Sequence, residues 1–157
     1  MTSKSKYYKG KILSNEEIEL IDRVSYQDSI IAHDSYQNVV GAKMIMGFTN
    51  HPDLKYLWDK IKYHILDPSK LLRSYILEYT QGNYTQPHVD LADYTAITML
   101  PCEFEGGCMA IEGEFITLDV GETVIINSYQ EHEVGLIESG TRRVNVAWFK
   151  KNDNKRN

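Results

Sequence analysis

Hydrophobic residues recur at helical spacing in two segments of the N-terminal half of the chain. The first segment follows Ser14-Asn15-Glu16-Glu17, which has the form of a capping box, with Glu17 placed to reach back to the Ser14 amide. Its apolar positions are Ile18, Leu20, Ile21 and Val24. This pattern predicts a helix that begins at the capping box and buries one side.

A second helix is predicted to begin near Asn50 and to end at Asp67-Pro68-Ser69. Pro52 falls in its first turn, where the missing N–H costs nothing. Its apolar positions recur three and four residues apart, at Leu54, Leu57, Trp58, Ile61 and Ile65. We expect Asp53 at the helix start to accept hydrogen bonds from the exposed N–H groups and to interact favourably with the positive end of the helix dipole.

After residue 70 the pattern changes to short alternating runs separated by turn residues. Strands are expected at 71–79, 84–90, 95–100, 108–112, 114–118, 122–127, 131–137 and 141–149. A set of about eight strands with two helices packed outside is typical of a mainly β jelly-roll. We therefore expect one domain over residues 1–150, with helical support over about 1–70, a jelly-roll core over about 71–149, and a polar tail at 150–157.

Composition narrows the class of protein. The chain has 157 residues, a net charge of −5 and a pI near 5.5, which argues against a large phosphate-binding face and a nucleic-acid partner. The two cysteines, Cys102 and Cys108, make no disulfide framework and are interpreted as reduced thiols. No signal peptide or membrane span is indicated, so a soluble cytoplasmic protein is expected. Nothing in the sequence indicates an oligomeric state.

The stretch QPHVDLADY contains a His-x-Asp pair, His88 and Asp90. With 5 His and 22 acidic residues, about 0.7 His-x-acid pairs are expected by chance, so the spacing alone is weak. A second pair, His51 and Asp53, lies at the predicted helix start, where capping is the favoured interpretation.

A strand would make His88 and Asp90 converge, because residues two apart point to the same face and Val89 points away. A third ligand must then come from another strand. His132 is the other histidine in the strand half, and it opens the run 131–137 with Val134 and Leu136 on its own face. A polar residue that leads an apolar inward face needs a partner, which is either a metal ion or a backbone carbonyl.

Two histidines and one carboxylate form the facial triad that leaves three positions open on Fe(II). Such a site can bind an oxidisable cosubstrate through two atoms and O₂ through the third. If the cosubstrate is a keto-dicarboxylate, its far carboxylate needs a cation at the end of the pocket.

The run TRRVNVAWF offers that cation. Arg142, Val144, Val146 and Trp148 share one face of the expected strand, while Arg143 begins the other face. A buried arginine is costly without an anion, and a guanidinium matches a carboxylate bidentately. The alternative is that this face is ordinary core and that Arg142 lies at a hydrated strand end.

Taken together, these residues resemble a known family. The order Y-x-x-G-x-Y…H-x-D…G-G…H-x-V-x-x-I-x-x-G-x-R…W, over about residues 71–149, is similar to that of the Fe(II)/2-oxoglutarate-dependent dioxygenases, in particular their prolyl-hydroxylase-like branch. The resemblance implies a double-stranded β-helix that holds one iron through His88, Asp90 and His132.

The resemblance also assigns the cosubstrate pocket. It implies that Arg142 pairs with the far carboxylate of 2-oxoglutarate, that Tyr79 hydrogen-bonds the same carboxylate, and that Trp148 lies beside the pocket. It places Thr98 in the lining, at a position where relatives often carry Tyr. Collagen-type relatives usually have Lys in place of Arg142, which disfavours that subgroup.

The implied reaction is hydroxylation of an unactivated C–H bond by O₂, with 2-oxoglutarate converted to succinate and CO₂ and with ascorbate as an additional cofactor. A prolyl residue of a protein or peptide is the first expected substrate, followed by free proline or another small molecule. Val89, Val144, Val146 and Trp148 would form a dry wall. Two other classes stay open: a cupin-like non-redox metalloenzyme and a catalytically silent jelly-roll binding module.

Overall fold

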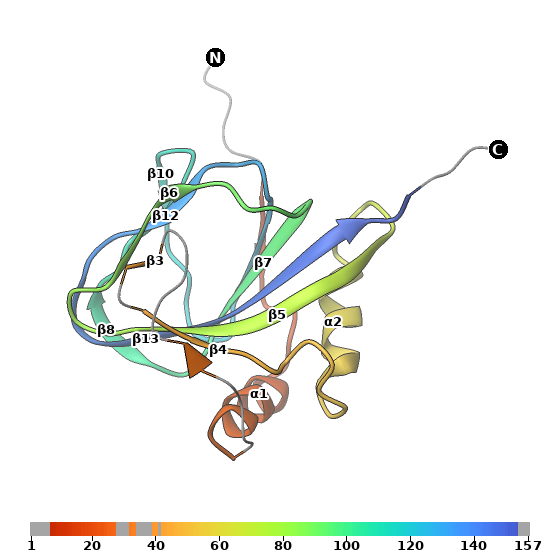
Figure 1. The fold of residues 1–157 in the computed structure, drawn as a ribbon, viewed down its shortest axis with the longest axis horizontal. Coiled ribbons are helices and arrows are strands. Elements are labelled where there is room, and N and C mark those ends of the chain that lie inside the picture. Colours follow the sequence, from red (N-terminus) through yellow and green to blue (C-terminus); the bar gives the residue numbers. More distant parts are fainter. Residues whose placement is uncertain (1–6, 28–31, 34–38, 41, 154–157) are drawn as a thin grey trace.

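The computed structural model describes residues 7–27, 32–33, 39–40 and 42–153 as two helices and thirteen strands (Figure 1). The helices are α1 (Asn15–Gln27) and α2 (Lys55–Lys62). The strands before and just after α2 are β1 (Tyr8–Gly10), β2 (Ala32–His33), β3 (Val39–Val40), β4 (Lys43–Ile45) and β5 (Ser69–Tyr79). The remaining strands are β6 (Tyr84–His88), β7 (Tyr94–Met99), β8 (Glu103–Gly106), β9 (Met109–Ile111), β10 (Glu114–Ile116), β11 (Thr123–Asn127), β12 (His132–Val134) and β13 (Ile137–Lys151).

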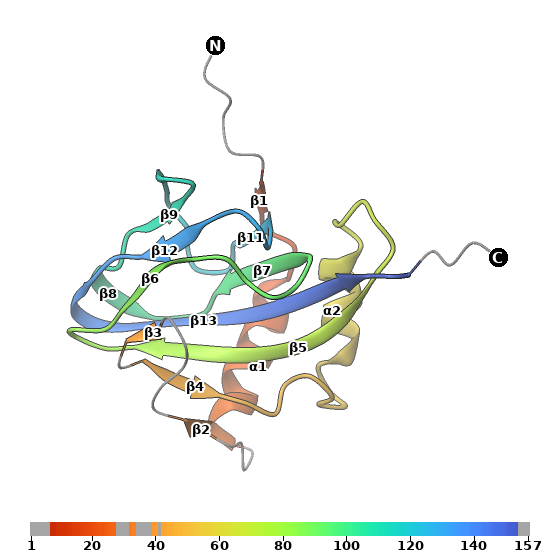
Figure 2. The ribbon, with the colours of Figure 1, turned by 45° about the horizontal axis from the view of Figure 1, so that its top comes forward.

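Two antiparallel sheets face each other. The larger has the order β1-β11-β7-β13-β5-β4-β2, with β8 paired to β13 as well, and the smaller has the order β10-β9-β12-β6-β3. Figure 2 shows β13 and β5 running side by side across the larger sheet, with α1 and α2 on its far side. This arrangement confirms the predicted jelly-roll with two supporting helices.

The helices bury their apolar sides on the outer face of the larger sheet. Ile21 of α1 and Leu57 and Ile61 of α2 are fully buried, in one cluster with Ile76 of β5 and Phe149 of β13. A second cluster lies between the two sheets and includes Leu77, Val144 and Trp148. The central strands are therefore covered on both faces, which is why their sequences show little polar alternation.

The N-terminal capping box of α1 forms as the sequence predicts. The Glu17 amide donates to the Ser14 hydroxyl at 3.1 Å, and Glu17 Oε1 accepts from the Ser14 amide at 2.8 Å. Lys60 of α2 also donates to Glu17 Oε1, at 2.5 Å, so the same carboxylate ties the two helices together. Burial alone would raise the pKa of Glu17, but these hydrogen bonds and the Lys60 charge lower it.

The predicted start of the second helix was wrong by five residues. The chain makes turns at 52–54, and α2 begins at Lys55, with Leu54 in the N-cap position and no side-chain cap. Asp53 therefore does not cap the helix; its own amide donates to Nδ1 of His51 at 3.2 Å. Local turn hydrogen bonds, such as Leu54 N–H to the His51 carbonyl at 3.1 Å, satisfy this segment instead.

Several strands were missed or misplaced by the sequence reading. β1 to β4 and β8 have two to four residues each and are defined by their pairing partners, such as β11 for β1. The expected strand 131–137 is two strands, because β12 ends at Val134 and β13 begins at Ile137. Lys150 and Lys151, assigned to the tail, continue β13, and residues 154–157 lie outside the described residues.

Candidate metal centre and adjoining pocket

Three predicted ligands meet where β6 and β12 pair. His88 ends β6 and His132 opens β12, and the two are register partners in the antiparallel ladder. Asp90 lies two residues beyond β6, where its amide donates to the Ser128 carbonyl at 2.9 Å. The Ser128 amide donates in turn to the Asp93 carbonyl, also at 2.9 Å, so the loop after β6 is fixed against the turn before β12.

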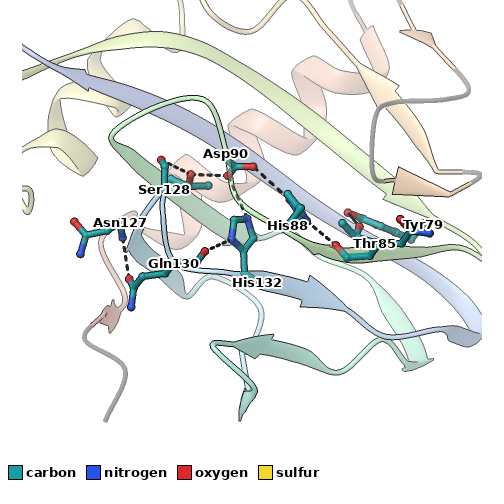
Figure 3. Close-up of polar contacts among 10 residues, drawn as sticks. Tyr79, Thr85, His88, Asp90, Asn127, Ser128, Gln130 and His132 are labelled. Carbon is teal, nitrogen blue, oxygen red and sulfur yellow. Dashed lines mark hydrogen bonds and ion pairs between the residues drawn. The ribbon is translucent and has the colours of Figure 1, made fainter. Parts of the chain in front are cut away.

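The donor atoms of this triad are close enough to share one ion. His88 Nε2 lies 3.3 Å from Asp90 Oδ1, and His132 Nε2 lies 3.2 Å from Asp90 Oδ2 (Figure 3). One ligand atom from each of the three residues falls within 4.8 Å of the others. Two atoms bound at about 2.0–2.2 Å to one cation lie at most about 4.4 Å apart, so the two distances to Asp90 fit a common cation.

Both imidazole rings are held in the tautomer that a metal needs. His88 Nδ1 lies 2.7 Å from the Gln86 carbonyl, and His132 Nδ1 lies 2.8 Å from the Gln130 carbonyl. A carbonyl only accepts hydrogen bonds, so each Nδ1 carries the proton and donates. In the metal-free protein Nε2 of each ring faces a carboxylate oxygen of Asp90 and can donate to it; with a metal bound, the same Nε2 would lose its proton and offer its lone pair, as histidines that ligate metals usually do. The sequence left open whether His132 binds a metal ion or a backbone carbonyl. Its Nδ1 contacts a carbonyl, and its Nε2 is still available to a metal.

The electrostatics of the triad favour a cation. Thr95 Oγ1 donates to Asp90 Oδ2 at 2.7 Å and lies 2.9 Å from the Ser128 hydroxyl. Burial alone would raise the pKa of Asp90, but the hydrogen bonds from His132, His88 and Thr95 hold it far below its ordinary value. Burial alone would lower the pKa of His88, but the bonds to Asp90 and the Gln86 carbonyl raise it. The donor set fits Fe(II), which binds two imidazoles and one carboxylate and keeps positions open.

Arg142 lies in the same pocket, and it makes no ion pair with an acidic residue in the part of the chain that the structure describes. Its side chain is 1% exposed, and its Nε has no hydrogen-bond partner among the described residues. Arg142 of β13 pairs in register with Tyr79 of β5, and its guanidinium carbon lies 5.2 Å from the Tyr79 ring centroid. The Tyr79 hydroxyl is 2.8 Å from Thr85 Oγ1. Burial lowers the pKa of Arg142 and raises that of Tyr79.

Arg143 occupies the opposite face of β13 and is fully paired. It is 3% exposed, and its guanidinium donates to Glu78 Oε2 at 2.8 Å, to Ser25 Oγ at 2.7 Å, and to Asp22. The ring of Tyr26 lies 4.5 Å from its guanidinium carbon. Arg143 therefore fastens α1 to the outer face of the larger sheet, and the predicted alternation of the two arginines is confirmed.

The pocket extends from the triad to Arg142 between the two sheets. About 460 Å³ of space in and above it is free of protein atoms, and part of that space is open solvent. Its lining comes from both sheets: Leu77, Tyr79, Thr85, His88, Asp90, Thr95, Ile97, Met109, His132, Glu133, Val134, Arg142, Val144, Val146 and Trp148. Six of the seven residues that the sequence reading assigned to the site are in this lining.

The seventh, Thr98, was misplaced. Its hydroxyl lies 2.7 Å from that of Thr123 on the face of β7 that turns toward the helices, and its neighbour Ile97 lines the pocket instead. Val89 was likewise wrongly placed in the dry wall, because it is 52% exposed and lies outside the lining. β7 is apolar on both faces, so the strand pattern could not choose between Thr98 and Ile97.

Sequence reasoning missed the residues that support the site. Thr95 donates a hydrogen bond to the Asp90 carboxylate. The Ser128 hydroxyl contacts that of Thr95, and the Ser128 carbonyl accepts from the Asp90 amide. Thr85 contacts Tyr79 across the sheets. Small hydroxyl residues are common in strands, and their partners here come from different strands. The one available signal was position, because Thr95 opens an apolar run five residues after Asp90.

Comparisons with known proteins identify the fold. No protein-family model matches the chain, and no curated protein matches its sequence. Solved structures do match. One is an oxidoreductase of the 2OG-Fe(II) oxygenase family from Burkholderia pseudomallei, at 12% identity over 90% of this chain and 82% of that one, with a TM-score of 0.71.

Two further structures extend the likeness. The viral collagen prolyl hydroxylase from Paramecium Bursaria Chlorella virus-1, as its 2-oxoglutarate complex, is 17% identical over 91% of this chain and 94% of that one, with a TM-score of 0.69. HygX from Streptomyces hygroscopicus, with nickel and 2-oxoglutarate bound, is 9% identical over 94% and 83%, with a TM-score of 0.72. The chain thus has the jelly-roll fold of the 2OG-Fe(II) oxygenases.

One further finding concerns membranes. Within residues 7–27, 32–33, 39–40 and 42–153, no helix is long and apolar enough to cross a bilayer.

Proposed function

We propose that this protein is an Fe(II)- and 2-oxoglutarate-dependent oxygenase. The observation that carries the proposal is the content of one pocket: a His-Asp-His triad at one end, and at the other a buried guanidinium that has no ion pair among the described residues. A triad alone fits many metalloproteins. A buried cation with no counter-ion is costly, and a carboxylate ligand would offset that cost.

Each residue has a distinct role in the proposed site. His88, Asp90 and His132 would hold the metal, with the Gln86 and Gln130 carbonyls fixing the ring tautomers. Bound there, iron would supply the O₂ activation that couples 2-oxoglutarate decarboxylation to hydroxylation of a C–H bond.

The other end of the pocket would position the cosubstrate. Arg142 would bind its far carboxylate through the guanidinium fork. The Tyr79 hydroxyl, now directed at Thr85, can donate a second bond to the same carboxylate. Val144, Val146 and Trp148 would exclude water from the space between.

The substrate is proposed to be a prolyl residue of a protein or peptide. The support is the fold that this chain shares with the viral collagen prolyl hydroxylase. A small molecule is the second candidate, since HygX has the same fold. Ascorbate as an additional cofactor and a cytoplasmic location remain part of the proposal, testable by succinate yield with and without ascorbate and by cell fractionation.

An anaerobic titration tests the proposal directly. Fe(II) alone should give no visible band, and subsequent 2-oxoglutarate should produce a charge-transfer absorption that reports chelation by the keto acid. Asp90→Ala should not form the band, whereas the control His51→Ala should form it fully, because His51 lies in the segment before α2 and outside the lining of the pocket. Absence of the band in the wild-type protein would refute the proposal.

The same preparation separates the other two classes. A catalytically silent binding module would contain no stoichiometric metal after purification with Fe(II). A cupin-like non-redox enzyme would bind metal but form no succinate from 2-oxoglutarate under air. Arg142 favours the oxygenase over the cupin, because a non-redox metal site does not require a buried arginine to bind the carboxylate of a cosubstrate.

A further inference from the structure

A second arginine lies on the inner face of the larger sheet, beside Trp148 of the pocket lining. Arg73 of β5 is the register partner of Trp148 on β13, and Trp148 is the register partner of Thr95 on β7. Thr95 donates to Asp90. Adjacent strands are about 4.8 Å apart, so the Arg73 backbone is about 10 Å from that of Thr95, within reach of a substrate bound at the metal.

The side chain of Arg73 is held in place without being neutralised. Its guanidinium carbon lies 4.9 Å from the Trp148 ring centroid, and the Tyr75 ring packs against the same indole, with centroids 5.3 Å apart at 68°. Arg73 is half-buried and makes no ion pair with any acidic residue among those described. Arg143, by contrast, has two carboxylate partners.

A second group beside Arg73 also needs an acceptor. Trp148 is 2% exposed and lines the pocket, and its Nε1 is buried with no hydrogen-bond partner within the described part of the chain. An indole N–H only donates, and a guanidinium only donates. The neighbourhood therefore offers donors and a positive charge, and it lacks the anionic acceptor that would satisfy them.

We propose that Arg73 is a specificity-determining residue that binds a carboxylate of the substrate, next to the carbon that is oxidised. The inference rests on the proposed function and goes beyond it by naming the charge of the substrate. Arg142 would serve the cosubstrate at the closed end of the pocket, and Arg73 the substrate near the metal. The carboxylate can come from a free amino acid or chain end, or from an acidic side chain in a peptide.

Calorimetric titration with matched probes tests the inference. The protein is loaded with Zn(II), which is redox-inert, and with saturating 2-oxoglutarate, so that Arg142 is already occupied. One pair of probes is L-proline and L-prolinamide, and the other is the N-acetylated, C-amidated peptides Glu-Pro and Gln-Pro. At least one acid should bind about tenfold or more tightly than its amide, and the pair that shows this identifies the source of the carboxylate.

Variants assign the preference to Arg73. Arg73→Gln should abolish it, and Arg73→Lys should retain part of it, because an ammonium keeps the charge without the fork. The control Arg23→Gln removes the same charge from an exposed position on α1 and should keep the full preference. Equal binding of acid and amide, no measurable binding of either acid, or a preference that persists in Arg73→Gln would overturn the inference. The comparison of acid with amide in the wild-type protein does not depend on any variant folding. If the wild-type protein loaded with Zn(II) does not bind 2-oxoglutarate, that result counts against the proposed function rather than against the role of Arg73.

Discussion

The adjacent arginines of β13 allow the cosubstrate site and the fold to be perturbed separately. Arg142 faces the pocket and has no ion pair within the described part of the chain, whereas Arg143 faces α1 and pairs with Asp22 and Glu78. Replacing each by Met removes the charge and keeps most of the side-chain volume. The two variants should therefore fail in opposite ways.

Arg142→Met should weaken 2-oxoglutarate binding and leave the fold intact. Truncating one partner of a buried, hydrogen-bonded charge pair costs about 2–5 kcal/mol, which corresponds to roughly 30- to 5,000-fold in affinity. Arg142 has no ion-pair partner among the described residues, so the free protein loses no such pair. Exchanging an uncompensated buried charge for an apolar side chain should leave the melting temperature unchanged or raise it.

Arg143→Met should do the reverse. Breaking a buried ion pair costs about 3–5 kcal/mol, and since Asp22 and Glu78 are 25% and 18% exposed and can regain water, we expect about 2–3 kcal/mol. For a chain of this length the melting temperature should fall by roughly 5–10 °C. The 2-oxoglutarate affinity of the folded fraction should change little, because Arg143 is on the other face of the sheet.

The assay pairs thermal melts of the apo-proteins with 2-oxoglutarate titrations at fixed Fe(II), monitored anaerobically by the charge-transfer band. The titrations are run well below the melting temperature of the weaker variant. If Arg143→Met is the variant that loses 2-oxoglutarate affinity, or if Arg142→Met is the one that unfolds early, the assignment of the two faces of β13 is wrong by one residue.

Three further outcomes are expected. Asp90→Ala should bind no stoichiometric iron and form no succinate, with its fold retained by circular dichroism; retained turnover would remove the triad from the mechanism. His51→Ala should keep wild-type iron content and turnover, and lost iron affinity would mean that the other His-x-Asp pair holds the metal. Glu17→Gln should lower stability at pH 7 by roughly 1 kcal/mol, since it weakens the capping box and the contact with Lys60. The pKa of Glu17 is lowered in the folded protein, so this contribution is fully present above the unfolded pKa near 4.5 and is lost as the pH falls through the lower pKa of the folded state. Thermal melts at pH 7 and pH 3 should therefore differ more between the two proteins at pH 7.

Local rules in the sequence determined much of this protein. The capping box of α1 depends on residues three apart, and it formed as expected. Alternation along β13 separated Arg142 from Arg143, because its polar residues break an otherwise apolar run. The spacing of two between His88 and Asp90 brought both side chains to one side, although Asp90 lies just beyond the strand.

Other features were decided only by the tertiary structure. The start of α2 depended on a turn in which His51 accepts a hydrogen bond from the Asp53 amide. This turn replaces the helix cap that the sequence predicted at Asp53. The short strands β1 to β4 exist because long neighbours such as β11 and β5 offer edges for pairing. Thr98 and Ile97 could not be told apart, since β7 is buried on both faces.

The contacts that support the metal site were also decided only by the tertiary structure. The partners of Asp90 are Thr95 and Ser128, 33 residues apart, and they meet only because β7 and β11 pair and bring the following turn beside the loop after β6. The position of Arg73 over Trp148 depends in the same way on the pairing of β5 with β13. Sequence determines which side of its own strand a residue takes, whereas contacts between strands depend on pairing and register, which are set by the packing of the whole sheet.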